Sequence, residues 1–101
     1  MLFSFSIIPV GVGSSLGDHL AKVLKIVDES GLPYKVNPMG TAIEGEWDEV
    51  MAVIKECHQS VMASSERAYL LINADDRKNK PNRLEEKVKS IEKRLGRKLK
   101  K

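Results

Sequence analysis

The amino-acid sequence predicts an α+β fold in which helices cover one face of a four-stranded antiparallel sheet. Three observations lead to this prediction. Strand and helix patterns alternate twice in the same order, the first two helical segments are amphipathic, and a chain of 101 residues suits a single core. Two strand–helix–strand halves with right-handed crossovers give the order βαββαβ, which is the ferredoxin-like sandwich. We therefore expect one domain over residues 1–101, with an appended helix at residues 82–96 and a basic tail at residues 97–101.

The first strand and helix occupy the first third of the chain. Phe3, Phe5 and Ile7 alternate with Ser4, Ser6 and Ile8, which is the period of a half-buried strand, and Pro9 is expected to end it. Leucine and valine then recur at helical spacing between Leu16 and Val27, with Ser15 as the expected N-cap and Gly31 just beyond the end. This strand followed by an amphipathic helix forms the first half of the predicted sandwich.

The rest of the chain predicts three more strands and two more helices. A very short strand at residues 34–36 is separated by the breaker pair Asn37-Pro38 from a strand at residues 39–45. A helix is expected from about Glu46 to residues 63–65, with Trp47 on its apolar side and acidic residues in its first turn. Asn82 and Glu85 predict the start of a last helix, which Gly96 ends. Residues 67–77 predict the fourth strand, with an inward row of Ala68, Leu70, Ile72 and Ala74.

Because two helices cover only one face of such a sheet, the other face is hidden by a partner or used for binding. If the phenylalanines of the first strand face the helices, Ser4 and Ser6 lie on the open face. Glu44 is assigned to the same face, because a carboxylate is costly to bury under a helix, and Thr41 then lies opposite to it. The expected open face is mixed in polarity and presents Ser4, Ser6, Ala42, Glu44, Tyr69, Leu71, Asn73 and Asp75.

The net charge of +3 hides a division of the chain. Residues 77–101 hold twelve Lys/Arg and three Glu, a net charge of +9, whereas residues 1–76 hold five Lys/Arg and eleven Asp/Glu, a net charge of −6. A lysine-rich terminal helix is typical of a solvated face, or of one that complements the acidic body of a neighbouring subunit. The chain has no apolar run of about 18 residues and no signal-peptide pattern, so we expect a cytoplasmic protein without a membrane partner.

No set of residues in the sequence predicts a catalytic centre. Cys57 is the sole cysteine, so neither an internal disulfide nor a cysteine-based metal cluster can form within one chain. His19 and His58 lack the spacing of paired metal ligands, and no Ser/His/Asp constellation can be argued. We expect a protein that is not an enzyme and that needs no metal or cofactor.

Four short blocks of sequence carry a resemblance to a known family. They are SIIPVG at residues 6–11, SGLPY at residues 30–34, MGTAIEGEW at residues 39–47 and DDR at residues 75–77. With these blocks the chain resembles the small thiamine-binding protein family over residues 2–95. The resemblance implies a ferredoxin-like fold, strand-mediated dimers that pair into a homotetramer, and non-catalytic binding of thiamine or of its hydroxymethylpyrimidine part.

The resemblance also suggests binding residues. Carried over position by position, it points to Thr41 and Glu44 in the central block, Pro9 in the first loop and Arg77 after the last strand. Thiamine has an aminopyrimidine and a cationic thiazolium ring, so carboxylates would accept from the amine or offset the charge, and an aromatic ring would stack. Together with the open face, the expected ligand-binding set is Ser6, Pro9, Thr41, Glu44, Tyr69, Asn73, Asp75 and Arg77.

Two alternatives from other functional classes stay open. A nonspecific nucleic-acid-binding module would fit a ferredoxin-like sheet with a basic tail, but residues 39–45 contain no aromatic residue on which bases could stack. Nucleic acid is therefore not the expected partner. A structural or regulatory oligomer would use the open face for subunit packing and bind another small ligand or none.

Overall fold

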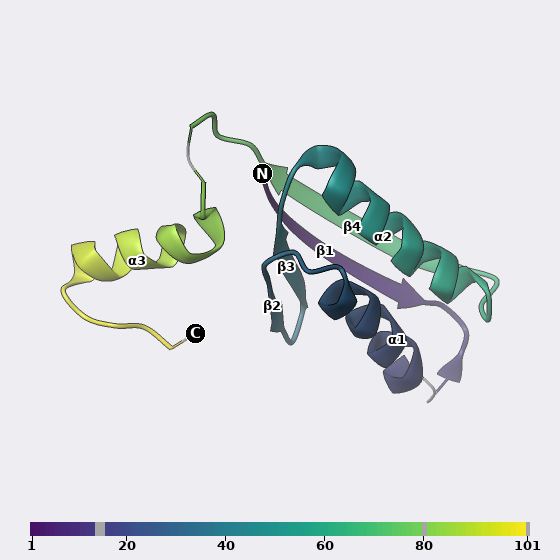
Figure 1. The fold of residues 1–101 in the computed structure, drawn as a ribbon. Coiled ribbons are helices and arrows are strands. Elements are labelled where there is room, and N and C mark those ends of the chain that lie inside the picture. The colour runs from purple at the N-terminus through teal and green to yellow at the C-terminus, as the bar shows by residue number, and fades with distance from the viewer. Residues whose placement is uncertain (14–15, 80, 101) are drawn as a thin grey trace.

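The computed structural model describes residues 1–13, 16–79 and 81–100, and the elements follow the predicted order. The elements are β1 (Leu2–Pro9), α1 (Leu16–Glu29), β2 (Tyr34–Asn37), β3 (Gly40–Glu44), α2 (Trp47–Met62), β4 (Ala68–Asp75) and α3 (Arg83–Leu95). All strand pairs are antiparallel, and the order across the sheet is β2-β3-β1-β4. Helices α1 and α2 lie side by side on one face of the sheet, and α3 stands beyond its end (Figure 1). The predicted ferredoxin-like α+β fold with an extra C-terminal helix is confirmed.

The core lies between the sheet and the pair α1 and α2. In β1 the side chains of Phe3, Phe5 and Ile7 are buried, whereas Ser4 and Ile8 are exposed, as the alternation predicts. The other buried apolar side chains come from α1, β3 and α2: Val23, Val27, Ile43, Val50, Val53, Ile54, Cys57 and Val61. Burial of this set is the main favourable term for the fold.

The central strand β1 is longer than its neighbour β3. All eight residues of β1 pair with β4, whereas β3 pairs with β1 only as far as Phe5, which lies opposite Thr41. Beyond that point the chain turns back at residues 38–39, where the Met39 N–H donates to Asn37 Oδ1 at 2.9 Å. The second half of β1 therefore has no strand beside it on the β3 side.

β4 is less buried than its pattern predicts. Ala68 and Leu70 pack against the core, but Ile72 is 37% exposed and Ala74 is also exposed. The expected inward row is thus only half covered, because β4 is the edge strand and the buried helix residues pack over the middle of the sheet. Trp47 also differs from expectation, since it is 54% exposed even though its ring contacts Phe3 with 5.9 Å between the ring centroids.

The ends of the helices are mostly where the sequence places them. Gly31 follows α1 with φ 77° and Gly96 follows α3 with φ 73°, the left-handed conformation that favours glycine after a helix. Before α2 the Glu46 N–H donates to Glu49 Oε1 at 3.1 Å, which satisfies a backbone donor at the helix start. The N-cap expected at Ser15 lies outside the described residues.

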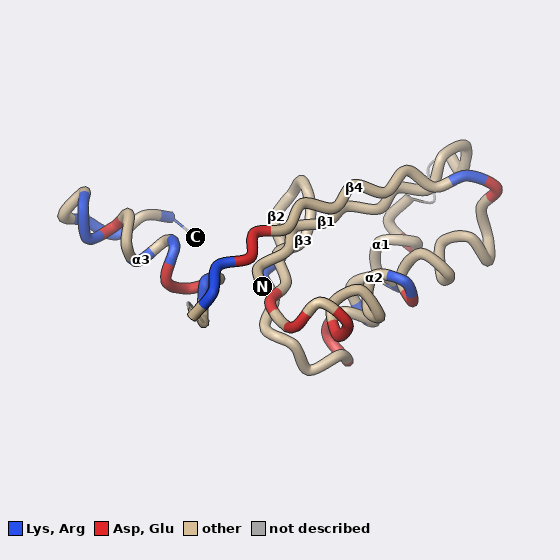
Figure 2. The backbone as a smooth tube through the Cα atoms, turned by 90° about the horizontal axis from the view of Figure 1, so that it is seen from above, with Lys and Arg blue, Asp and Glu red and all other residues tan. Residues whose placement is uncertain are grey.

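α3 does not join the core, although it is amphipathic. None of its residues is buried, and Ile91 and Leu95 on its apolar stripe are 49% and 54% exposed. The radius of gyration is 15.0 Å, larger than the roughly 13 Å of a compact chain of this length. Many of the Lys and Arg positions lie on α3 and on the segment that leads to it (Figure 2). No helix in the described ranges combines the length and apolar character needed to cross a bilayer.

Replacement of a core residue by alanine tests the location of the core. We expect Ile43→Ala to lower the free energy of unfolding by about 2–5 kcal/mol, because Ile43 is fully buried and its loss leaves a cavity. Met62→Ala, at the exposed end of α2, is the control and should cost less than about 1 kcal/mol. Urea unfolding at one protein concentration measures both values. Equal losses in the two variants would contradict this assignment of the core.

Candidate functional site

The residues expected to bind a ligand do not form one cluster, because the sheet separates them. Thr41 and Pro9 are buried in the rows that face the helices, and Arg77 is exposed beyond the end of β4. The remaining five lie on the open face of the sheet, as predicted: Ser6, Glu44, Tyr69, Asn73 and Asp75. The site must therefore be sought separately on the two faces.

The open face is shallow in the middle. A depression of about 140 Å³ on this face is lined by residues of β1 and β4 and of the hairpin: Ser4, Phe5, Ser6, Met39, Leu71 and Asn73. Tyr69 lies further along β4, opposite Ile8, and is 54% exposed. The hydroxyls and the amide can make hydrogen bonds here, but the depression is below the usual size of a small-molecule site.

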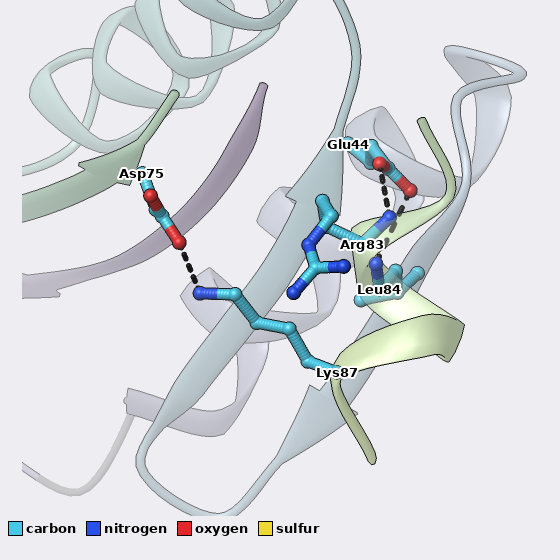
Figure 3. Close-up of polar contacts among 5 residues, drawn as sticks. All are labelled: Glu44, Asp75, Arg83, Leu84 and Lys87. Atoms are coloured by element: carbon cyan, nitrogen blue, oxygen red, sulfur yellow. Dashed lines mark hydrogen bonds and ion pairs between the residues drawn. The ribbon is translucent and has the colours of Figure 1, made fainter. Parts of the chain in front are cut away.

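Glu44 holds the start of α3. Its Oε2 accepts from the Arg83 N–H at 2.7 Å and its Oε1 from the Leu84 N–H at 3.3 Å (Figure 3). These amides belong to the first turn of a helix, where donors have no intrahelical partner and the dipole favours a negative charge. The carboxylate expected to accept from a ligand is thus engaged within its own chain.

This contact replaces the cap that the sequence predicts. Asn82 occupies the N-cap position of α3, but its φ is 60° and its side chain makes no capping hydrogen bond. The prediction that Asn82 caps the last helix through its side chain is therefore wrong. The capping oxygens come from Glu44, which is 39 residues earlier than Arg83 and reaches it only because β3 ends beside α3.

Two ion pairs add to the contact between α3 and the sheet. Lys87 donates to Asp75 Oδ2 (Figure 3). Lys35 Nζ, on β2, lies 3.0 Å from Glu85 Oε1. The hydrogen bond from Lys87, followed by the positive charge of Lys87, holds the pKa of Asp75 below its ordinary value. These side chains are partly exposed, so each pair contributes little on its own. We name Glu44, Lys35 and Asp75 the α3 anchor.

A larger cavity lies at the other end of the sheet, between α1 and the β2–β3 hairpin. Its volume is about 390 Å³, within the range of small-molecule sites. The walls are apolar side chains of α1 and residues 36–41 of the hairpin, and residues 5–8 of β1 form its floor. The α1 wall consists of Leu16, Leu20, Val23 and Leu24. We name this space the hairpin cavity.

Polar groups in the hairpin cavity are few. Ser6, Asn37 and Thr41 supply the polar side chains of its lining. Thr41 is only 5% exposed, and its hydroxyl makes no hydrogen bond to the part of the chain that the structure describes. An apolar cavity with a small number of polar groups is the usual form of a small-molecule site.

Gly40 allows the hairpin to approach β1 so closely. A Cβ atom at this position would lie 2.9 Å from the Phe5 carbonyl oxygen, closer than real Cβ contacts come. Any larger residue would push the hairpin away from the strand. The glycine of the central block therefore shapes the hairpin cavity, and its neighbour Thr41 lines it.

The described residues hold no candidate metal site, and their single cysteine is not activated. No group of three or more potential metal ligands occurs among them. Burial, followed by the charge of Glu56, raises the pKa of the Cys57 thiol to about 11, so the thiol is protonated at neutral pH. His19 is buried with its Nδ1 3.4 Å from Ser64 Oγ, a contact that joins α1 to the end of α2.

Analysis of the sequence missed the hairpin cavity. Leu20 and Leu24 follow the same helical spacing as core residues, and nothing local marks them as the wall of a cavity. The expected strand lengths gave no signal either, because residues 39–45 are expected to form a strand at least as long as residues 3–8, whereas β3 spans only Gly40–Glu44 and β1 spans Leu2–Pro9. The contact of Glu44 with α3 had no local signal.

Comparison with known proteins gives a consistent result. A family model described as thiamine-binding protein matches residues 3–92. A UPF0045 protein of Synechocystis sp. is 38% identical over 93 residues, which cover 91% of this chain and 77% of that protein. A UPF0045 protein of Methanocaldococcus jannaschii is 36% identical over 86 residues, which cover 85% of this chain and 86% of that protein.

Solved structures show the same fold. The crystal structure of a hypothetical protein from Methanocaldococcus jannaschii superposes with a TM-score of 0.83 at 34% identity and covers 89% of this chain and 93% of that one. A protein from Thermotoga maritima described as a putative thiamine biosynthesis/salvage protein superposes with a TM-score of 0.79 at 24% identity, covering 89% of this chain and 96% of that one. At that identity the second likeness speaks for the fold alone.

Removal of the Glu44 carboxylate tests its role as the cap of α3. We expect Glu44→Ala to lower the local stability of the first turn of α3 by about 0.5–2 kcal/mol, the usual cost of losing an N-cap. Hydrogen exchange of the Arg83 and Leu84 amides measures the loss. Glu66→Ala removes the same charge from an exposed loop position and is the control. Unchanged exchange of both amides in Glu44→Ala would show that the cap is not formed.

The Lys87 contact predicts a pH dependence. The pKa of the Asp75 carboxyl group is lower in the folded chain than its ordinary value of 3.8. The ion pair of Asp75 with Lys87 therefore stabilises the attachment of α3 fully above pH 3.8, and this stabilisation is lost as the pH falls through the lowered pKa. Replacement of Lys87 by methionine should move the titration of the Asp75 carboxyl group upward, as followed by NMR.

Lys89→Met is the matched control for this titration, because Lys89 lies 3.8 Å from Glu86 and has no contact with Asp75. An Asp75 titration that is the same in the Lys87→Met variant and the unaltered protein would contradict the pairing.

Proposed function

We propose that this chain, which belongs to the thiamine-binding protein family, binds thiamine or its hydroxymethylpyrimidine part as a homo-oligomer and without catalysis. The family match spans residues 3–92 and so includes every element of the sheet and its two covering helices.

The hairpin cavity is the observation that carries this proposal. Its volume of about 390 Å³ has room for a ligand of two small rings. Its apolar walls suit the faces of an aromatic ring, and Thr41 and Ser6 offer hydroxyls that can act as donor or acceptor. Two of the residues expected to bind ligand, Ser6 and Thr41, lie in this lining.

The open face supports the proposal less well. Both oxygens of Glu44 and Oδ2 of Asp75 already accept hydrogen bonds from α3, so an amine would have to share these carboxylates with α3. We therefore place the ligand in the hairpin cavity. Tyr69, Asn73 and Asp75 then serve the contact between subunits.

The apolar surface that the single chain leaves exposed supports the proposal of an oligomer. Tyr69 and Leu71 on the open face are 54% and 51% exposed, and the apolar stripe of α3 is uncovered as well. Exposed apolar groups gathered on one face are typical of a protein interface. We propose the tetramer, a dimer of dimers, as the form in solution.

The basic segment at residues 77–101 favours a second candidate function. Its net charge of +9 would attract a polyanion such as a nucleic acid, without sequence specificity and with strong dependence on salt. Tyr69 is the aromatic residue that the open face would offer to a base. With a single such residue, the polyanion alternative is the weaker of the two.

Calorimetric titration with thiamine and with hydroxymethylpyrimidine tests the proposal, with the molar mass measured by light scattering on the same sample. We expect saturable binding with a micromolar or tighter dissociation constant. Leu20→Trp, which fills the hairpin cavity from a 38% exposed position, should weaken binding at least about tenfold. Met62→Ala, at an exposed position outside the lining of the cavity, is the control and should leave binding unchanged. Tyr69→Ala tests the open face.

The opposite pattern, loss in Tyr69→Ala but not in Leu20→Trp, would move the site to the open face. The absence of heat with both ligands would overturn the thiamine proposal. Retention on heparin that is lost at moderate salt would then favour the polyanion alternative.

A further inference from the structure

The second half of β1, which pairs with β4 but has no β3 residue on its other side, forms the floor of the hairpin cavity. Pairing between β1 and β3 ends at Phe5 opposite Thr41, and the cavity is lined by residues 5–8 of β1. The cavity thus occupies the place that a longer β3 would fill. Unpaired peptide groups at the edge of a strand are strong hydrogen-bonding groups and need partners.

The direction of each peptide group in β1 follows from one hydrogen bond. The Val10 N–H donates to the Arg67 carbonyl on the β4 side at 2.8 Å. Residues two apart in an antiparallel strand present their N–H and C=O to the same neighbour. The N–H and C=O groups of Ser6 and Ile8 therefore point toward β4, whereas those of Phe5 and Ile7 point toward the β3 side.

Ile7 is the residue at which this edge is free. Phe5 is still paired with Thr41, but no residue of β3 lies opposite Ile7. Pro9 is the next residue that points the same way, and proline has no backbone N–H. Proline is usually found at such an unpaired strand edge. Among the described residues, the N–H and C=O of Ile7 thus form a pair of one donor and one acceptor without a backbone partner beside the cavity.

We infer that the aminopyrimidine ring of the ligand pairs with the Ile7 peptide edge, its ring nitrogen accepting from the Ile7 N–H and its exocyclic amine donating to the Ile7 C=O. The inference rests on the proposed function and adds the orientation of the ligand and the basis of its specificity. An aminopyrimidine carries its amine next to a ring nitrogen, so its edge holds a donor and an acceptor in the order that the strand residue requires.

The surroundings of Ile7 fit a flat ring in this place. Leu20 and Val23 of α1 and Val36 of the hairpin offer apolar contact to its faces, and Thr41 is the next polar group along the same edge. In such a site the ring takes the place of the missing residues of β3. Recognition comes from the main chain, so a carboxylate is not needed to hold the amine.

The inference predicts discrimination between analogues that differ in one exocyclic group. Oxythiamine carries a carbonyl in place of the amine and a proton on the adjacent ring nitrogen, so its donor and acceptor are interchanged. It should bind at least about tenfold more weakly than thiamine, because both peptide groups of Ile7 would face like groups. Pyrithiamine keeps the aminopyrimidine and changes only the other ring, so it should bind about as well as thiamine.

Hydrogen exchange of single amides in the full-length protein gives a second readout. We expect saturation with thiamine to slow exchange of the Ile7 amide at least about tenfold, because this N–H has no strand partner in the free chain. The amides of Phe5 and Ile8 are the internal controls, since the sheet already pairs them.

Three outcomes are distinguishable. Weak oxythiamine binding together with slowed Ile7 exchange supports the inference. Thiamine binding without discrimination against oxythiamine, or with unchanged Ile7 exchange, overturns the inference and leaves the proposed function standing. The absence of binding by thiamine and pyrithiamine alike would remove both.

Discussion

The difference in length between β1 and β3 is the constraint on which the rest of this structure depends. β4 follows β1 along all eight residues, but β3 leaves it after Phe5. The hairpin turns back early, α1 spans the gap above it, and the hairpin cavity is what remains between them. If β3 were as long as β1, its additional residues would lie where the cavity is now. The site is thus a property of the backbone pairing and depends less on particular polar side chains.

At the opposite end of the sheet, the start of α3 is held by polar contacts. α3 begins with donors that its own turn cannot satisfy, and the carboxylate of Glu44 supplies the acceptors from the open face. Lys87 and Lys35 add weaker ion pairs at the same end. Beyond this α3 anchor the helix has no buried residue, so its position relative to the sheet depends on a few polar contacts. Polar contacts of this kind are weaker than the packing that holds α1 and α2.

The fold was predictable because its signals are local. The alternation in residues 3–8 and the helical spacing of the buried valines fix which faces meet, and the structure buries Phe3, Phe5 and Ile7 accordingly. The surroundings of the expected binding residues were only partly predictable, because they depend on long-range register. Thr41 faces the helices as expected, but its place in a cavity depends on where β3 stops relative to β1. Glu44 lies on the open face as expected, yet its partner, the first turn of α3, is distant in the sequence and has no pattern that announces it.

The placement of α3 outside the core also determines how the whole molecule behaves in an electric field. The body formed by residues 1–76 has a net charge of −6, and residues 77–101 turn the chain into a cation of +3. Because no residue of α3 is buried, a proteolytic cut in the segment before it would leave the hydrophobic core complete. That single cut would reverse the sign of the protein's electrophoretic mobility at neutral pH. The shortened protein would bind to an anion exchanger, whereas the whole chain binds to a cation exchanger.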